Sequence, residues 1–207
     1  MFRLYKYRSF TTGTDRKRLK RILIRHELYC PTPVELNDPY DCNIGTADQF
    51  IGQLIKFGVF CTSGEKHNDI LLFSHYADKH TGLCLVFQVD TERIIAETSF
   101  LGFSERVNYV QDFPKFDGTN IHHLPKTKYF VWEYEDEYRV LADLESRPSK
   151  FRSFEKDELV EVRFGLEMKE QDQQLIKQWS NLGGLSRVRF SKADLRQDTF
   201  QLSYSPL

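Results

Sequence analysis

The stretch Trp132-Glu133-Tyr134-Glu135-Asp136-Glu137-Tyr138-Arg139-Val140-Leu141 joins a dense acidic run to the start of an expected β-strand. Side chains alternate between the two faces of a strand, so Glu135, Glu137 and Arg139 share one face if the chain is extended from Glu135 onward. Two carboxylates placed so closely repel each other. The charge pattern alone favours a solvated strand edge, where Arg139 offsets the repulsion, over a cleft with perturbed carboxylate pKa values. The three flanking aromatic residues weaken the solvated interpretation.

The order of apolar patterns around this stretch predicts an α+β fold. Alternating or continuous apolar runs predict strands at residues 4–9, 27–31, 59–62, 83–89, 106–110, 138–142, 159–164, 186–190 and 200–204. Helical spacing of apolar residues predicts helices at 16–26, 47–57 and 169–179, and residues 71–79 are expected to form a short helix or a bend. The strands cluster too closely for a simple alternating parallel sheet, so we expect a mixed, split β-sheet with flanking helices.

Length and composition indicate a single domain over residues 1–207, with 40% hydrophobic and 29% charged residues. Residues 111–126 hold two prolines and a glycine and are the best candidate for a long surface loop. No stretch approaches the ~20 apolar residues of a membrane span, and the first residues carry charges where a signal peptide needs an apolar run. We therefore expect a cytoplasmic protein without membrane contact. The four cysteines are widely spaced and form no C-x-x-C pair, which fits a reducing compartment and no zinc site.

The formal net charge of −1 hides a split along the chain. Residues 1–30 contain nine Lys or Arg and two Asp or Glu, a sum of +7, and residues 31–207 contain twenty against twenty-eight, a sum of −8. Six of the cations lie at 16–25, on the first predicted helix. A basic helix of this kind can contact nucleic-acid phosphates. An ordinary solvated helix face also explains the run without any ligand.

Four separated segments together resemble a large family of bacterial domains of unknown function. They are Tyr5-Lys6-Tyr7-Arg8-Ser9, Asn37-Asp38-Pro39, Ser74-His75-Tyr76-Ala77 and Trp132-Glu133-x-Glu135-x-Glu137-x-Arg139. The similarity runs over nearly the whole chain, and we place the family within the ADP-ribosyltransferase-like superfamily. The resemblance implies the fold of that superfamily, with NAD as the substrate.

The resemblance also implies roles for particular residues. Arginine-type ADP-ribosyltransferases carry an Arg on the first strand, a Ser-Thr-Ser on a later strand and a Glu/Gln-x-Glu where another strand begins. Here Arg8 matches the first motif, Cys61-Thr62-Ser63 departs from the second at its first residue, and Glu135-Asp136-Glu137 matches the third. Glu137 would then hydrogen-bond the ribose of NAD and stabilise the oxocarbenium-like transition state, and Glu135 would orient the acceptor. The residues expected to contact NAD are Tyr7, Arg8, Thr62, Ser63, His75, Tyr76 and Arg139, the arginines because guanidinium binds pyrophosphate in bidentate fashion.

The implied activity is transfer of ADP-ribose from NAD to a protein or nucleic acid, in a toxin or phage-defence effector that a partner protein neutralises. The basic amino end would then meet the phosphates and the acidic strand start the ribose. Two alternatives remain open. One is a non-catalytic domain that binds a nucleotide or nucleic acid through Arg8 and the basic helix. The other is a metal-dependent nuclease or phosphohydrolase that uses the acidic cluster, although we expect no metal ligands, since His75 and His80 are spaced poorly for one helix face.

Overall fold

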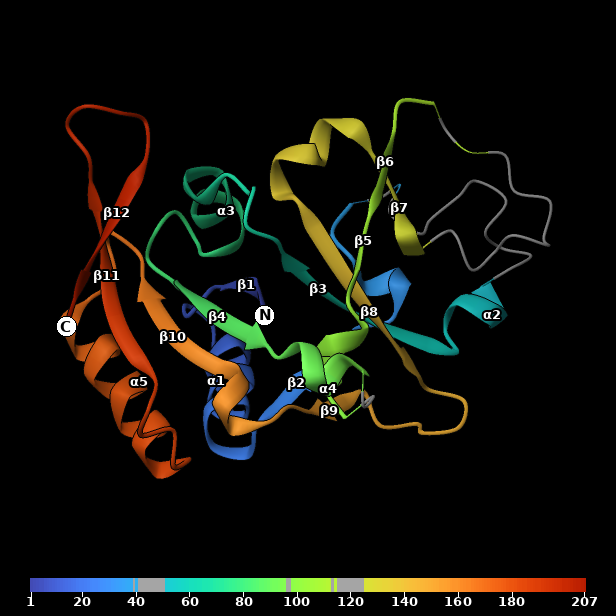
Figure 1. The fold of residues 1–207 in the computed structure, drawn as a ribbon, viewed down its shortest axis with the longest axis horizontal. Helices are drawn as coiled ribbons and strands as arrows, with labels where there is room; N and C mark the ends of the chain where they lie inside the picture. The colour runs from blue at the N-terminus through green and yellow to red at the C-terminus, as the bar shows by residue number, and fades with distance from the viewer. Residues whose placement is uncertain (39, 41–50, 96–97, 113, 115–124) are drawn as a thin grey trace.

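In the computed structural model, the described residues are 1–38, 40, 51–95, 98–112, 114 and 125–207. The main sheet consists of β1 (Phe2–Arg8), β3 (Phe57–Ser63), β4 (Leu83–Val89), β5 (Glu105–Arg106), β8 (Glu137–Asp143), β10 (Leu159–Phe164), β11 (Arg189–Leu195) and β12 (Leu202–Pro206). Its strand order is β12-β11-β10-β4-β1-β3-β8-β5, as Figure 1 shows across the width of the molecule. Two short sheets flank it, β2 (Glu27–Tyr29) with β9 (Phe151–Ser153), and β6 (Asn108–Val110) with β7 (Thr127–Tyr129).

The helices are spread over both faces and ends of this sheet. The α-helices are α1 (Gly13–Arg25), α2 (Ile51–Leu54), α3 (Asp69–Tyr76), α4 (Thr91–Ile95) and α5 (Glu170–Leu182). Short 3-10 turns are η1 (Pro33–Glu35), η3 (Leu101–Phe103), η5 (Phe130–Glu135) and η6 (Lys156–Glu158). Within the main sheet β10 and β11 run parallel, and the other neighbouring strands run antiparallel. The prediction of an α+β fold with a mixed sheet and flanking helices is therefore confirmed.

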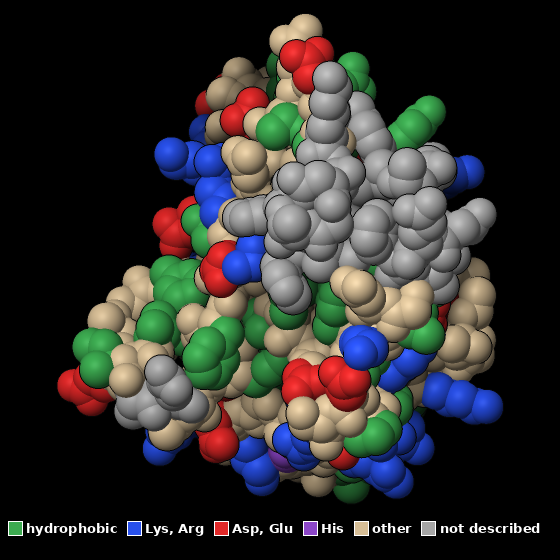
Figure 2. Space-filling model, turned by 90° about the vertical axis from the view of Figure 1, so that its right-hand side faces the viewer, with side chains coloured by type: hydrophobic (Ala, Val, Ile, Leu, Met, Phe, Trp, Pro, Cys, Tyr) green, Lys and Arg blue, Asp and Glu red, His purple; other side chains and the backbone are tan. Residues whose placement is uncertain are grey.

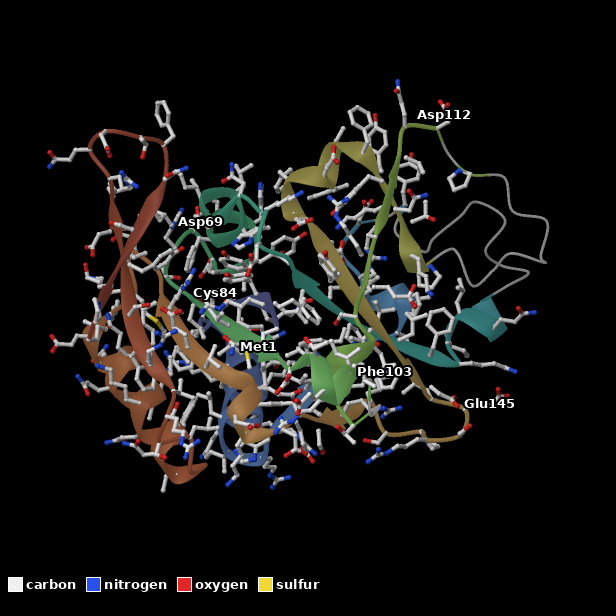
Figure 3. All side chains as sticks on the ribbon, viewed as in Figure 1. Met1, Asp69, Cys84, Phe103, Asp112 and Glu145 are labelled. Atoms are coloured by element: carbon white, nitrogen blue, oxygen red, sulfur yellow. The ribbon has the colours of Figure 1, made fainter. Side chains whose placement is uncertain are left out.

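Strand β4 lies at the centre of the core because its apolar run leaves only Gln88 partly exposed. Alternation along the neighbouring β1 divides the core into two clusters. Leu4 faces α1 and α5 on one side, whereas Tyr5 and Tyr7 face α3 on the other. Figure 3 shows side chains filling the space on both sides of β4, where Cys84 is labelled.

Helix α1 forms where the sequence predicts a helix and begins slightly earlier. Thr12 caps the helix through two reciprocal hydrogen bonds. Its side chain accepts one from the Asp15 amide, and the Asp15 carboxylate accepts one from the Thr12 amide. The helix buries Leu19, Ile22 and Leu23, one apolar stripe at helical spacing, and leaves its basic residues on the remaining surface.

The main sheet is nearly split between β1 and β3. Strands β1 and β4 pair along seven residues, and so do β3 and β8, but β1 and β3 pair only at Tyr5 and Ser63. Beyond this pair the Lys6 ammonium donates a hydrogen bond to the Cys61 carbonyl at 2.6 Å. The Val59 amide donates a hydrogen bond to the carbonyl of Pro31 at 2.7 Å instead of pairing with β1. The two halves of the sheet are thus joined by one ladder position and a side chain, which leaves an opening between them.

Several predicted boundaries are wrong or lie outside the described residues. The helix expected at 47–57 ends at Leu54, because Phe57 is already part of β3, where it pairs with Asp143 of β8. The first four residues of the expected helix are outside the described part of the chain. The strand expected at 186–190 runs instead over β11, which pairs with β10 from Arg189 onward. Most of the loop expected at 111–126 lies outside the described residues.

The described cysteines agree with the expectation of small buried side chains in two cases. Cys30 and Cys84 are fully buried free thiols, whereas Cys61 is half-buried. Burial raises the pKa of Cys30 and of Cys84 to about 12. Within the part of the chain that the structure describes, no helix has the length and apolar character needed to cross a membrane.

Candidate functional site

A pocket of about 150 Å³ lies at the opening between β1 and β3. Most of the predicted site residues line it, namely Tyr7, Arg8, Thr62, Ser63, Tyr76, Glu135 and Glu137. They come from β1, the end of β3, α3 and the η5–β8 junction, four segments that are far apart in the sequence. Two predicted contacts are not in the lining, His75 and Arg139.

One end of the pocket is a buried acidic pair bridged by a lysine. Lys128, on β7, donates to Glu135 Oε2 at 2.6 Å and to Glu137 Oε2 at 2.7 Å. All three side chains are at most 5% exposed. The ammonium therefore separates two carboxylates that would otherwise repel each other in a poorly hydrated site.

Arg139 holds Glu137 from behind rather than lining the pocket. Its Nε donates to Glu137 Oε1 at 2.7 Å and its Nη2 to Glu137 Oε2 at 3.0 Å. Its Nη1 donates to the carbonyl of Pro125 at 3.0 Å. Arg139 therefore orients the Glu137 carboxylate from outside the pocket lining, and its contact with NAD stays a prediction.

The two carboxylates differ in their acid–base behaviour. Burial acts to raise the pKa of Glu137, but the charges of Arg139 and Lys128 outweigh it, so the pKa lies below its ordinary value. Burial raises the pKa of Glu135, and the negative charge of Glu137 raises it further. The positive charge of Lys128 lowers this pKa, but not enough to offset the other two effects. Glu137 is thus held ionised, while Glu135 is the member of the pair that accepts a proton more readily.

The backbone at Asp136 brings this pair together. Asp136 adopts a left-handed conformation, with φ of 43°, at the end of η5. Its carboxylate accepts hydrogen bonds from Arg106 Nε at 2.8 Å and from the Lys66 amide at 3.0 Å, and its carbonyl accepts one from the Gly64 amide. The strand begins at Glu137, so Glu135 and Glu137 do not share one face of an extended chain. Glu135 and Glu137 are linked by hydrogen bonds from the Lys128 ammonium to both carboxylates.

Tyrosine hydroxyls line the same pocket. Tyr76 donates to Glu135 Oε1 at 2.6 Å, and burial followed by the Glu135 charge raises its pKa. Tyr7 pairs with His67 Nε2 at 2.7 Å. The other ring nitrogen of His67 contacts the Gly64 carbonyl, which only accepts, so Nδ1 carries the proton and Nε2 accepts from Tyr7. His75 is exposed and packs near Tyr76 and Tyr134 with ring centroids more than 6 Å away, outside the pocket.

Three further cations line the pocket, Lys6, Arg8 and Arg18. Lys6 and Arg8 alternate with Tyr5 and Tyr7 on β1 and therefore lie on the opposite face, and Arg18 reaches the same pocket from α1. Burial lowers the pKa of Lys6 and of Arg8. Within the described residues none of these three cations forms an ion pair with a carboxylate. The carboxylates of Glu135 and Glu137 are thus paired with cations in the pocket, whereas Lys6, Arg8 and Arg18 form no ion pair with a carboxylate within the described residues.

The basic helix is only partly available for nucleic acid. Arg16 pairs with Asp172 at 3.3 Å, and Arg21 pairs with Glu27. Three cations of the helix are exposed, Lys17, Lys20 and Arg25. The face of the molecule drawn in Figure 2 carries acidic, basic and apolar side chains intermixed.

Lys128 is a site residue that the sequence does not predict, and Arg18 is predicted only as one member of the basic helix at 16–25. Lys128 stands seven residues before Glu135 with no repeating pattern between them, and Arg18 was one of six cations of the helix. Trp132 follows Lys128 by four residues, and the centre of its ring lies 5.0 Å from the Lys128 ammonium. In the described part of the chain no group of three or more His, Cys, Asp or Glu side chains is placed to hold a metal ion.

Comparisons of the chain with protein-family models, with curated proteins and with solved structures give no match.

Proposed function

We propose that the protein transfers ADP-ribose from NAD to a macromolecular acceptor, a protein or a nucleic acid, with Glu137 as the catalytic carboxylate. The observation that carries the proposal is the convergence of Arg8, Ser63 and Glu137 in one pocket. These residues come from β1, β3 and β8 and match, in order, the motifs that the resemblance to ADP-ribosyltransferases assigns to NAD. Widely separated positions would have removed the basis for that assignment.

The chemistry of such a transfer fits an ionised Glu137. The bond between ribose C1′ and the nicotinamide nitrogen breaks, the bonding pair leaves with nicotinamide, and positive charge develops on the ribose. A fixed carboxylate stabilises that charge. Glu137 accepts three hydrogen bonds from Lys128 and Arg139 and has about four acceptor positions, so one remains for a ribose hydroxyl.

Glu135 and Tyr76 are placed to orient the acceptor. The acceptor adds to C1′ and loses a proton, and Glu135 is the carboxylate of the pair that takes a proton more readily. The pocket of about 150 Å³ is smaller than the roughly 300–1,000 Å³ of most small-molecule sites. It therefore encloses one part of the dinucleotide, and the rest extends over the surface beside it.

A second candidate function is nucleotide binding without catalysis. Lys128 and Arg139 neutralise the two carboxylates, which weakens their attraction for a developing cation. The same two cations argue against a metal-dependent hydrolase, because a divalent ion would have to displace them from Glu135 and Glu137.

Release of nicotinamide from NAD by the purified protein tests the proposal. We expect release that survives a chelator and falls at least about 100-fold in Glu137→Gln. The matched control is Glu133→Gln, an exposed carboxylate on η5, the 3-10 turn that precedes β8, and this variant leaves the rate unchanged. NAD binding without any release supports the non-catalytic function, and release abolished by the chelator supports the hydrolase.

A further inference from the structure

Cys61 is a nucleophilic residue of the pocket to which the proposed reaction gives no role. It lies on β3, two residues before Ser63, and lines the same pocket as Glu137. In the pairing of β3 with β8, Cys61 lies opposite Arg139 and Ser63 lies opposite Glu137. Residues directly opposite each other on antiparallel strands share one face of the sheet, so the thiol projects on the same side as the Glu137 carboxylate.

The thiols of the described cysteines differ in their accessibility. Cys61 is half-buried and lines the pocket, whereas Cys30 and Cys84 are fully buried. Burial raises the pKa of Cys30 and of Cys84 to about 12, so both stay protonated and unreactive at neutral pH. Among the cysteines that the structure describes, Cys61 is therefore the one that a small molecule can reach.

An ammonium group lies beside Cys61. Lys6 Nζ donates a hydrogen bond to the Cys61 carbonyl at 2.6 Å. Burial lowers the pKa of Lys6, and so does the Arg8 charge, whereas the negative charges of Cys61, Glu137 and Glu135 raise it, with Cys61 the largest of the three. The interaction is mutual, because a cation near a cysteine stabilises the thiolate, which is the reactive form.

Ser63 gives independent evidence that a bound molecule belongs in the space beside Cys61. Ser63 is only 7% exposed and lines the pocket. In the part of the chain that the structure describes, the Ser63 hydroxyl has no hydrogen-bond partner. Buried hydroxyls are nearly always paired, so we expect a ligand group in the pocket to pair with this one.

The charges around the pocket favour an anionic reagent. Lys6, Arg8 and Arg18 line it and form no ion pair with a carboxylate within the described residues, although the charge of Asp15 acts on Arg8. The two carboxylates of the pocket are themselves paired with cations. A small disulfide that carries carboxylates is therefore attracted more strongly than a cationic disulfide.

We propose that Cys61 is a modification site at which a small anionic disulfide closes the pocket. The Cys61 thiol releases its proton to water, and the thiolate attacks one sulfur of the disulfide. A bond forms between Cys61 Sγ and that sulfur, the original sulfur–sulfur bond breaks, and the other half of the reagent leaves as a thiolate. The protein thiol is thereby oxidised, and the leaving half of the reagent is reduced.

The attached group regulates the same site. It occupies the space beside Ser63 and Glu137, so a ligand cannot enter until a reductant removes it. The modification itself depends only on Cys61 and its surroundings, whereas its effect on turnover rests on the proposed function.

Mass spectrometry of the protein treated with oxidised glutathione tests the site. Cys42 lies outside the described residues, so every measurement uses a Cys42→Ser background. We expect one adduct, at Cys61, which dithiothreitol removes and which is absent after Cys61→Ser. Cystamine, a cationic disulfide, should react at least about threefold more slowly than oxidised glutathione.

Lys6→Gln tests the contribution of the ammonium. We expect oxidised glutathione to modify Cys61 at least about threefold more slowly in this variant. Lys17→Gln is the matched control, because it removes the same charge from an exposed position and should change the rate less than about twofold.

Release of nicotinamide from NAD gives the second readout. We expect release to fall at least about tenfold in the modified protein and to return on reduction, with no fall in treated Cys61→Ser protein. A Cys61 adduct on a protein that releases no nicotinamide before treatment supports the modification site and contradicts the proposed function. Turnover that continues in the folded, fully modified protein supports the proposed function and overturns the closing of the pocket. No adduct at Cys61, or modification of Cys30 or Cys84 at an equal rate, overturns the site.

Discussion

Lys128 is the residue on which the acidic end of the pocket depends. Its ammonium lies between Glu135 and Glu137, and all three side chains are nearly inaccessible to solvent. A buried ion pair contributes little when it is compared with an apolar replacement of the whole group, but removing one partner leaves an uncompensated charge. The site is therefore more sensitive to the loss of Lys128 than to the loss of any exposed lysine.

We predict that Lys128→Met lowers the free energy of unfolding by about 3–5 kcal/mol at pH 7. The deficit shrinks on acidification. Because Lys128 and Arg139 hold the pKa of Glu137 below its ordinary value, the stability that Glu137 contributes is present above that ordinary value and is lost as the pH falls below it. Urea unfolding at pH 7 and pH 4 measures both effects.

The control for this prediction is Lys126→Met. Lys126 pairs with Glu105 on the surface, and such exposed pairs contribute roughly 0–1 kcal/mol. Equal losses in the two variants, or a deficit for Lys128→Met that grows as the pH falls, would contradict the bridging role of Lys128.

The sequence predicts which residues form the acidic part of the site better than it predicts how their side chains are arranged. The local acidic run predicts Glu135 and Glu137 as site residues, but a shared face of an extended chain does not explain their proximity, because the strand begins at Glu137. The left-handed Asp136 is stabilised by Arg106 and the backbone of residues 64–66, which are distant in the sequence. No local pattern contains those partners. Lys128 stands only seven residues before Glu135, but no repeating pattern links the two residues.

Among the elements, the β4–β1 pair sets the position of Arg8. Gly82 precedes β4 and packs directly on the carbonyls of Arg8 and Ala77, so a methyl group there has no room. We predict that Gly82→Ala lowers the free energy of unfolding by about 1–3 kcal/mol and weakens ADP-ribose binding, because it displaces the end of β1. Urea unfolding and calorimetry measure the two effects.

Gly13→Ala serves as the control for this prediction. Gly13 begins α1 and has open space around its α-carbon, so alanine there leaves stability unchanged or raises it by up to about 1 kcal/mol. A Gly82→Ala protein with unchanged stability and affinity would show that β1 is not held closely at this point.

Elements with strong internal patterns were predicted well, and elements defined by distant pairing were not. The apolar runs of β4 and β10 gave their bounds correctly, 83–89 and 159–164. The short strands β7 and β9 were not expected, since three residues carry too little periodicity. Strand β11 starts later than expected because Leu185 and Val188 pack into the core and parallel pairing with β10 begins at Arg189.

For the whole molecule, the main feature is a sheet whose two halves meet at one ladder position. The pocket lies at this boundary, and its lining residues belong to both halves. A ligand there bridges them and stabilises the folded state by mass action. At a concentration 100 times its Kd, ADP-ribose should raise the free energy of unfolding by about 2.7 kcal/mol, which for a chain of this size raises Tm by about 5–10 °C.

Thermal unfolding with and without ADP-ribose measures this shift. Nicotinamide alone, which lacks the phosphates, should give a smaller shift at the same concentration. A Tm that ADP-ribose does not change would contradict binding at the boundary between the two halves of the sheet.

The central claim is that Glu137 promotes cleavage of the nicotinamide–ribose bond of NAD, and the most direct test separates binding from turnover in one variant. Glu137→Gln keeps the volume and an acceptor oxygen but removes the charge. We predict an NAD Kd within about threefold of the unmodified protein and a kcat for nicotinamide release at least about 100-fold lower. An unchanged kcat in the Glu137→Gln protein, or no nicotinamide release by the unmodified protein, would contradict the claim.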